Sequence, residues 1–252
     1  MIDTQRFSRF QCLALLAVGL LLNGCATEFA PSSQDTLESV ARDALGEAAY
    51  MQTLVRACRS LGGDTADEAE IVYGDWLDAH WAHVVAADDF YSQRLASRTH
   101  TYSDRPLALD AVDLSLSAQA RALDRLDLPR RSLSNQHNTC RRQLDQLSRA
   151  QTPLLEAEWQ HPYLDYLLAW HQGPEHHPVR EVPSLAIGVR PRQEPGRSYY
   201  AVEEQARQTC DNARLTVIDN DWPQEAYGVF CGEQPRQFVS CDWGHCEYEE
   251  VQ

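Results

Sequence analysis

A long stretch of helical periodicity constrains the fold of this chain more than any other feature of its sequence. From residue 35 to residue 170, apolar side chains recur at every third or fourth position and glycine is rare, which is the pattern of amphipathic helices. The first predicted helix starts near Asp35 and stops at the Gly62-Gly63 pair. Its apolar stripe consists of Leu37, Val40, Ala41, Ala44, Ala48, Met51, Val55, Cys58 and Leu61.

Further predicted helices follow within the same stretch, and prolines and capping residues set their boundaries. The second is capped by Asp64 and extends through Leu95. A helix of this length must fold back and pack against its neighbour. Amphipathic helices of this kind pack together, and we predict a mainly α fold with an antiparallel helical bundle over residues 35–170. The remaining predicted boundaries are Pro106 in the first turn of the third helix, Pro129 after its end, Leu133 to Leu147 for the fourth helix, and Thr152-Pro153 at the start of a fifth element that Pro162 interrupts.

The composition changes at residue 171, and the proline-rich residues 171–198 are predicted to link the bundle to a second unit. Within that linker only Leu185–Val189 is continuously apolar, so it is the candidate there for a short strand. Residues 199–252 are predicted to form a small α+β module, whose core is too small to be stable without covalent links. Its predicted elements are a helix from Ala201 to Arg214, strands at Leu215–Ile218, Ala226–Cys231 and Gln237–Cys241, and a frayed acidic tail with Glu247, Glu249 and Glu250.

The chain contains eight cysteines, of which Cys12 and Cys25 belong to the N-terminal segment. The others are even in number, which predicts disulfides and not metal binding or redox chemistry for a chain that reaches an oxidising compartment. Since each lies on the apolar stripe of its helix, Cys58 and Cys140 are predicted to form a bridge inside the bundle. The remaining cysteines are predicted to pair as Cys210 with Cys231 and Cys241 with Cys246 across the turn at residues 242–245, with Cys210–Cys246 and Cys231–Cys241 as the alternative pairing that stays open.

The N-terminal segment has the parts of an export signal. Arg6 and Arg9 precede an apolar run from Cys12 to Leu22 that is too short to cross a bilayer as a helix. The run ends in Leu22-Asn23-Gly24-Cys25, and this ending resembles the lipobox of bacterial lipoproteins. The resemblance implies a signal peptide over residues 1–24, a diacylglyceryl thioether and an acylated amino group on Cys25, and a tether over residues 25–34.

The residue after Cys25 bears on the location of the protein. Ala26 stands there instead of aspartate, and by resemblance to lipoprotein sorting in Gram-negative bacteria this implies the outer membrane, with the folded part facing the periplasm. Two or three acyl chains anchor a protein almost permanently, because each buried methylene contributes about 0.8 kcal/mol. An ordinary secretory signal cut after Gly24 or Ala26 is the alternative, and it leaves Cys25 as a plain thiol.

The charge of the chain limits the partners that it can bind. The sequence contains no lysine, and after removal of residues 1–24 it has 20 arginines against 36 acidic residues, a formal charge of −16. Such a field disfavours nucleic acid as a partner and gives no attraction to anionic lipid, so the acyl chains are the predicted membrane contact. Another envelope component is the predicted partner, and Glu203 and Glu204 are candidate acidic contact residues of the small module.

Two groups of histidines are weak candidates for metal ligands. His80 and His83 lie one helical turn apart, and the start of the linker is crowded by His171, His176 and His177. Neither group carries the HExxH signature of metalloproteases, so we expect structural histidines in the first group and incidental metal binding in the second. We therefore predict no cofactor.

Aromatic side chains on the second predicted helix are the other candidates for binding. Trp76 and Trp81 could line a ligand groove, although aromatic residues at helical spacing more often belong to the core. The sequence contains no GxSxG elbow, phosphate loop or dinucleotide fingerprint. The leading hypothesis is therefore a non-catalytic outer-membrane lipoprotein that binds or scaffolds another envelope component. The alternatives are a periplasmic metal-dependent hydrolase that uses the histidines and an inhibitor of a basic enzyme such as lysozyme.

Overall fold

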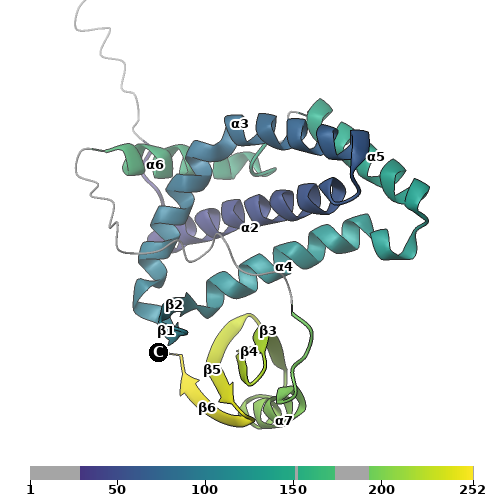
Figure 1. Ribbon diagram of the computed structural model, residues 1–252. Helices are drawn as coiled ribbons and strands as arrows, with labels where there is room; N and C mark the ends of the chain where they lie inside the picture. The colour runs from purple at the N-terminus through teal and green to yellow at the C-terminus, as the bar shows by residue number, and fades with distance from the viewer. Residues whose placement is uncertain (1–28, 151–152, 174–192, 252) are drawn as a thin grey trace, which may run out of the picture. The chain divides into compact units, whose positions relative to one another are not determined.

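The computed structural model describes residues 29–150, 153–173 and 193–251 (Figure 1). The described residues from 33 to 251 form one compact unit, which contains the helices and strands of the fold. Several predictions lie outside the described residues, and these concern Cys25, Leu185–Val189, His176 and His177. Among the helices of the described ranges, none combines the length and the apolar character that a membrane span requires.

The first two helices are long and run in opposite directions, as the periodicity predicts (Figure 1). They are α2, which spans Gln34–Arg59, and α3, which spans Gly63–Leu95. Ser33 caps α2, because its hydroxyl accepts a 3.1 Å hydrogen bond from the N–H of Thr36. The predicted cap of α3 is wrong: Gly62 is the N-cap, and Asp64 lies inside the first turn, where its charge interacts favourably with the helix dipole.

A β-hairpin replaces the start of the third predicted helix. β1 (Thr99–Tyr102) and β2 (Arg105–Ala108) pair antiparallel through a turn at Ser103-Asp104, in which both residues have positive φ. Pro106 lies in β2 opposite Thr101, so its prediction as a residue of a helical turn is wrong. Proline is tolerated there because both strands of a two-stranded ribbon are edges. The helix that follows, α4 (Leu109–Leu126), begins only after the hairpin.

The next helices follow the prediction in part. They are α5 (Leu133–Ala150) and α6 (His161–Gln172), and short 3₁₀ turns lie at Ala96–Arg98 (η1), Leu128–Arg130 (η2) and Glu158–Gln160 (η3). The predicted start of the fifth element is wrong, because residues 153–157 are irregular and Pro162 lies in the first turn of α6. Proline suits that position, since the N–H groups of a first helical turn have no partner within the helix. The predicted bridge between Cys58 of α2 and Cys140 of α5 is confirmed, with Cα atoms 5.5 Å apart.

Buried apolar side chains of the helical part form two clusters in the described ranges. Tyr50, Tyr73 and Leu147 pack against both clusters, so the core is continuous. The first cluster also includes Leu154 and Leu155. These two leucines therefore anchor the irregular segment 153–157 to the bundle by the burial of their own side chains.

The C-terminal part is a helix followed by an antiparallel sheet, which confirms the predicted α+β class. Its elements are α7 (Tyr199–Thr209), β3 (Ala213–Asp221), β4 (Gln224–Cys231), β5 (Gln234–Asp242) and β6 (His245–Glu250), and the strands lie in the order β3-β4-β5-β6. α7 ends at Thr209 and not at the predicted Arg214, because β3 has already begun by then. The predicted frayed tail is also wrong: its residues belong to β6, where Glu247 pairs with Ser240 and Glu249 with Phe238.

The disulfides of the C-terminal part decide the pairing that the sequence leaves open. Cys210, directly after α7, is bonded to Cys231 at the end of β4, with Cα atoms 6.1 Å apart. Cys241 and Cys246 are bonded across the β5–β6 turn, with Cα atoms 4.0 Å apart. With the bridge of the bundle, the described residues thus contain three disulfides, which are typical of an oxidising, extracytoplasmic compartment.

Both faces of the sheet are covered, so it is a middle layer between α7 and α4 (Figure 1). On the face towards α7, the buried side chains are Val202, Ala206, Tyr227, Val229, Val239 and Cys241. On the face towards α4 and the hairpin, they are Leu109, Ala226, Phe230 and Phe238. The hairpin is held there by the ring of His100, which stacks on Phe238 at 5.1 Å. It is also held by the hydroxyl of Tyr102, which donates a 3.2 Å hydrogen bond to Asp219.

Candidate functional site

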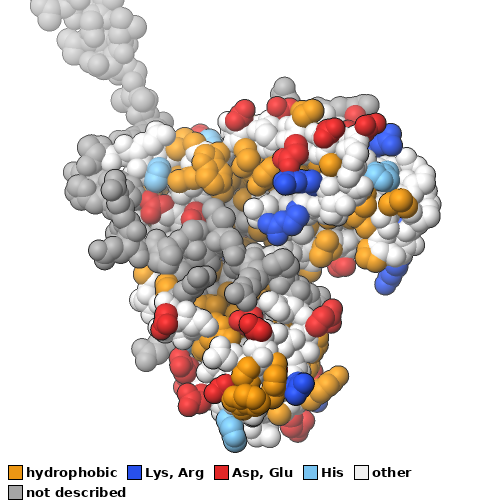
Figure 2. All heavy atoms as spheres, viewed as in Figure 1, with side chains coloured by type: hydrophobic (Ala, Val, Ile, Leu, Met, Phe, Trp, Pro, Cys, Tyr) orange, Lys and Arg blue, Asp and Glu red, His pale blue; other side chains and the backbone are white. Residues whose placement is uncertain are grey.

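Hydrophobic side chains reach the surface both over the helices and over the sheet (Figure 2). The large exposed ones include Trp81, Trp159, Tyr200 and Trp243. Exposed aromatic side chains mark contact surfaces when they gather, and pockets between helices are the other common kind of binding site. The described residues provide a candidate of each kind.

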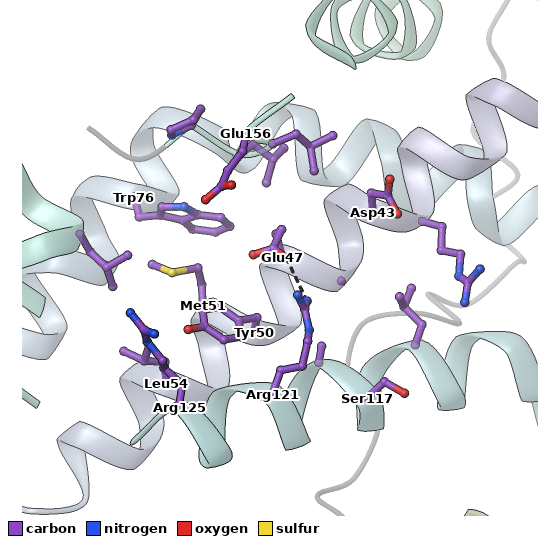
Figure 3. Close-up of a pocket in the computed structure, with 18 of the residues that line it drawn as sticks. Asp43, Glu47, Tyr50, Met51, Leu54, Trp76, Ser117, Arg121, Arg125 and Glu156 are labelled. Atoms are coloured by element: carbon purple, nitrogen blue, oxygen red, sulfur yellow. Dashed lines mark hydrogen bonds and ion pairs between the residues drawn. The ribbon is translucent and has the colours of Figure 1, made fainter. Parts of the chain in front are cut away.

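The pocket is a cleft of about 1090 Å³ between α2 and α4 (Figure 3). α5 and residues 153–160 contribute to its walls. α2 and α4 each line the cleft with one stripe of their surface, because the lining residues recur every three or four positions. From α2 these are Arg42, Asp43, Gly46, Glu47, Tyr50, Met51 and Leu54, and from α4 they are Leu114, Ser117, Ala118, Arg121 and Arg125.

The floor of the cleft is apolar. It consists of buried side chains from α2, α3 and the irregular segment, namely Met51, Leu54, Trp76, Leu154 and Leu155. A hydrogen bond of 2.8 Å from the amide of Gln160 to Asp43 ties this segment to α2. An apolar group of a ligand that is buried on such a floor gains about 25 cal/mol per Å² of its surface.

The rim of the cleft is charged, and its groups are paired between helices. Arg121 of α4 donates a 2.9 Å hydrogen bond to Glu47 of α2, drawn as a dashed line in Figure 3. Arg125 donates a 3.2 Å hydrogen bond to the side chain of Gln143 on α5. The side chains of Arg121 and Glu47 are 56% and 36% exposed, and exposed pairs contribute only about 1 kcal/mol or less. A charged ligand can therefore exchange for either partner at little cost.

Tyr50 lies between the floor and the rim. The guanidinium of Arg121 lies 5.4 Å from the centroid of its ring, within the range of a cation–π contact. Burial raises the pKa of Tyr50 above 10, and of the neighbouring charges Arg125 and Arg121 oppose this effect while Glu47 adds to it. The phenol is therefore neutral at physiological pH and can donate a hydrogen bond to a ligand.

The lining has the composition of a protein-binding site. Aromatic residues, methionine and arginine are enriched in the cores of protein interfaces. The cleft presents Trp76, Tyr50, Met51, Arg121 and Arg125. The stripe of α2 is roughly 18 Å long by the helical rise per residue, which corresponds to about twelve residues of a bound helix or about five of an extended chain. The cleft can therefore hold an amphipathic segment with charged groups on either side of an apolar one.

The structure separates the two tryptophans that the sequence suggested for a groove. Trp76 is 8% exposed and lies in the floor of the cleft, whereas Trp81 is 52% exposed and does not line it. Phe90 and Tyr91, farther along α3, are buried in the core. Trp76, Phe90 and Tyr91 recur at helical spacing because they are buried, whereas Trp81 lies on the exposed side of α3.

The candidate histidines have separate partners. Nε2 of His83 lies 3.4 Å from the carboxylate of Asp165, and Nδ1 of His171 lies 3.0 Å from that of Asp89. The ring of His80 packs edge-on against Trp76. Within residues 29–150, 153–173 and 193–251, no three His, Cys, Asp or Glu side chains are arranged to hold a metal ion. Instead, His83 and His171 connect α3 to α6.

The two candidate acidic contact residues lie on α7 and share one cation. Arg207 is 3.2 Å from the carboxylate of Glu203 and 3.7 Å from that of Glu204. Ion pairs of this spacing are common on helix surfaces and contribute a few tenths of a kcal/mol. The pairing with Arg207 therefore explains the presence of both carboxylates on α7 without a role in binding.

The rim residues of the cleft are absent from the sequence prediction. Glu47, Arg121 and Arg125 belong to no motif, and they come together only because α2 and α4 pack against each other. One feature of the sequence could have pointed to them. These charged residues lie at the edges of the apolar stripes of their helices, and not on the opposite, solvent-facing side. Comparisons with models of protein families, with curated proteins and with solved structures find no match for this chain.

Proposed function

We propose that this protein is a non-catalytic binding protein anchored to the bacterial outer membrane through Cys25, and that its cleft holds a segment of another envelope protein. The lipobox-like ending Leu22-Asn23-Gly24-Cys25 supports the anchor. The disulfides found in the described residues support a location outside the cytoplasm. The observation that carries the binding function is the lining of the cleft, with its apolar floor and its arginine-bearing rim.

The ligand that fits this lining is an amphipathic segment with one bulky apolar residue. That residue packs on Trp76 and Met51, which are buried in the free protein and so need little further ordering. Carboxylates that flank it bind Arg121 and Arg125, because a guanidinium can donate two parallel hydrogen bonds to a carboxylate. A basic group beside them binds Glu47.

Charge gives the cleft its selectivity. The chain as a whole carries a formal charge of −15, which repels acidic partners in general. The lining of the cleft is mixed in sign, with Arg42, Arg121 and Arg125 beside Asp43, Glu47, Glu156 and Glu233. An acidic segment is therefore favoured only when its carboxylates are positioned over the arginines. The cleft is small for a protein interface, and we expect a dissociation constant on the order of 10 μM.

Site-specific crosslinking in intact envelopes tests the proposal. A photoreactive amino acid at Gln146 of α5, which lines the cleft, should give one major adduct with a protein. The same amino acid at Gln52, an exposed position of α2 outside the cleft, is the control. The expected result is an adduct from Gln146 and none of comparable yield from Gln52.

A charge reversal makes the test specific for the rim. Arg125→Glu should lower the yield of the Gln146 adduct by about tenfold, which corresponds to about 1.4 kcal/mol. Arg130→Glu is the matched control, because its side chain is 86% exposed and lies outside the cleft. An adduct that Arg125→Glu leaves unchanged, or that Arg130→Glu lowers equally, would contradict a cleft-bound partner.

A further inference from the structure

Two tryptophans stand at neighbouring turns of the sheet. Trp222 lies in the turn between β3 and β4, and Trp243 lies in the turn between β5 and β6. The two turns are at the same end of the sheet, because the strands are antiparallel and lie in chain order. The rings are 5.8 Å apart in an edge-to-face arrangement, and we call this pair the tryptophan platform.

The fold does not require a tryptophan at position 243. Trp243 has a φ of 51° and Gly244 a φ of 81°, which is the geometry of a type I′ turn. Asparagine, aspartate and glycine are favoured at both central positions of that turn, and a bulky aromatic side chain is unfavourable there. Burial does not compensate, since Trp243 is 67% exposed. A costly residue that packs into no core indicates a role in binding.

The platform is held in place before any ligand arrives. The Cys241–Cys246 bond closes the β5–β6 turn directly behind Trp243. The backbone N–H of Trp243 donates a 3.0 Å hydrogen bond to the carbonyl of Pro223, which joins the two turns. The guanidinium of Arg197 lies 4.4 Å from the ring centroid of Trp222 and covers one face of that indole. Preorganisation of this kind reduces the entropy lost on binding.

A row of polar side chains crosses the same end of the sheet. In the strand register Asp221 is opposite Gln224, Gln224 is opposite Asp242, and Asp242 is opposite His245. All four residues are exposed. Neighbouring strands are about 4.8 Å apart, so the row offers a hydrogen-bonding group at each such step. The row combines carboxylate acceptors with an amide and an imidazole that can both donate and accept.

We propose that the tryptophan platform and this polar row form a binding site for a neutral glycan chain. The apolar C–H face of a sugar ring stacks on the exposed indole of Trp243, while its hydroxyls donate to the carboxylates of Asp221 and Asp242. Charge favours this class of ligand over a polyanion. From residue 199 to 252 the chain has eleven acidic residues and three arginines, a formal charge of −8, which repels nucleic acid and anionic lipid but not an uncharged sugar.

The glycan site is separate from the helical cleft and does not depend on its function. None of the residues of the tryptophan platform or of the polar row lines the cleft. A protein segment could also pack on exposed indoles, but the row of carboxylate and amide groups matches the repeated hydroxyls of a sugar chain better than an apolar anchor. The experiment below separates these two ligands.

Calorimetric titration of the full chain with neutral tetrasaccharides of N-acetylglucosamine and of glucose is the test. At least one should bind with a dissociation constant below about 1 mM. Trp243→Asn should weaken that binding by at least about tenfold, although asparagine suits the turn and should leave the melting temperature unchanged or higher. Trp159→Ala is the matched control, since Trp159 is 57% exposed but lies in the helical part, and it should bind like the wild type.

Three results would overturn the proposal. They are the absence of binding by any of these tetrasaccharides at millimolar concentration, equal binding by wild type and Trp243→Asn, and a protein ligand that needs Trp243 and is not displaced by the sugars. Arg125→Glu, which tests the cleft, should bind the tetrasaccharide normally. If the glycan binds but no Gln146 adduct forms in the protein that keeps Arg125, the result would support the platform and contradict the cleft.

Discussion

The carboxylate of Glu225 accepts a 2.8 Å hydrogen bond from the hydroxyl of Tyr227, and both side chains are fully buried. The same carboxylate accepts hydrogen bonds of 2.7 and 2.9 Å from the backbone N–H groups of Arg197 and Ser198, which lead into α7. Burial alone would raise the pKa of Glu225, but the hydrogen bonds from Ser198, Tyr227 and Arg197 outweigh it and hold the pKa below 4.5. One ionised side chain thus fastens the start of α7 to β4.

Replacement of this carboxylate should weaken the fold. Glu225→Gln keeps the shape of the side chain but turns an amide NH₂ towards backbone N–H groups, so we expect a loss of about 2 to 4 kcal/mol at neutral pH. Urea unfolding measures the free energy of unfolding. Glu233→Gln, at an exposed position of the β4–β5 turn, is the control and should change it by less than about 0.5 kcal/mol.

The same site predicts a pH dependence. Because the pKa of Glu225 is lower in the folded than in the unfolded protein, its contribution is fully present above about pH 4.5 and is lost as the pH falls through the folded pKa. The difference in unfolding free energy between wild type and Glu225→Gln should therefore be constant at neutral pH and shrink in acid. A difference that stays the same from neutral pH down to about pH 3 would show that the ionised carboxylate is not its source.

Position 196 requires a glycine, because its backbone lies very close to the side chains of Glu225 and Tyr227. A Cβ atom there would lie 2.5 Å from Oε1 of Glu225 and 2.7 Å from the hydroxyl of Tyr227. Gly196→Ala should therefore destabilise the protein by about 2 to 3 kcal/mol. Gly74→Ala is the matched control, because Gly74 is an exposed residue of α3 with no atom within 4 Å of an added Cβ. That substitution should stabilise the protein by about 0.5 to 1 kcal/mol, and both effects are measured as shifts of the unfolding midpoint in urea.

The disulfides should differ in their effect on stability according to the length of chain that they close. Cys58 and Cys140 are 82 positions apart, whereas Cys241 and Cys246 are 5 apart. Chain entropy predicts a loss of about 4.5 kcal/mol for the double alanine variant of the first pair and about 2 kcal/mol for that of the second. Denaturant unfolding measures both losses. Equal losses would show that strain or packing, and not loop closure, determines the contribution of these bridges.

The anchor prediction concerns the N-terminal segment. If the proposed anchor is correct, wild-type protein should incorporate a labelled fatty acid at Cys25 and sediment with the outer membrane. Cys25→Ser should abolish the label. Cys210→Ser is a useful comparison, since it also removes one sulfur but should leave acylation intact. Equal labelling of wild type and Cys25→Ser would contradict the lipid anchor.

Helices were more predictable from this sequence than strands, for reasons visible at particular residues. The stripe of α2 repeats over many turns, so an error at Asp35 or Asp64 shifts a boundary without changing the element. The β1–β2 hairpin has strands of only four residues, too short for a clear alternating pattern. Pro106 lies within it, and a proline at that point of the sequence is also typical of the first turn of a helix. β6 reads as an exposed acidic tail, and only its pairing with β5 and the Cys241–Cys246 bond make it a strand.

The candidate sites were less predictable than the fold. The cleft depends on the relative position of Glu47 and Arg121, which are far apart in the chain and share no motif. Trp243 lies in the turn that the sequence predicted between Cys241 and Cys246, but its proximity to Trp222 follows from the register of the strands between them. Sites assembled by packing in this way leave no fixed spacing for a sequence pattern to detect.

The position of the β1–β2 hairpin has a consequence for the order in which the chain matures. The ribosome delivers residues 99–108 well before residues 224–242, yet Tyr102 and Leu107 pack with Phe238 in one buried cluster. A two-stranded ribbon alone is marginally stable in water, so this segment must wait for β5 before its apolar side is covered. The hairpin at residues 99–108 therefore completes its folding only when the C-terminal sheet forms. In evolution, recombination that exchanged the C-terminal sheet alone would leave the hairpin without the surface that it covers.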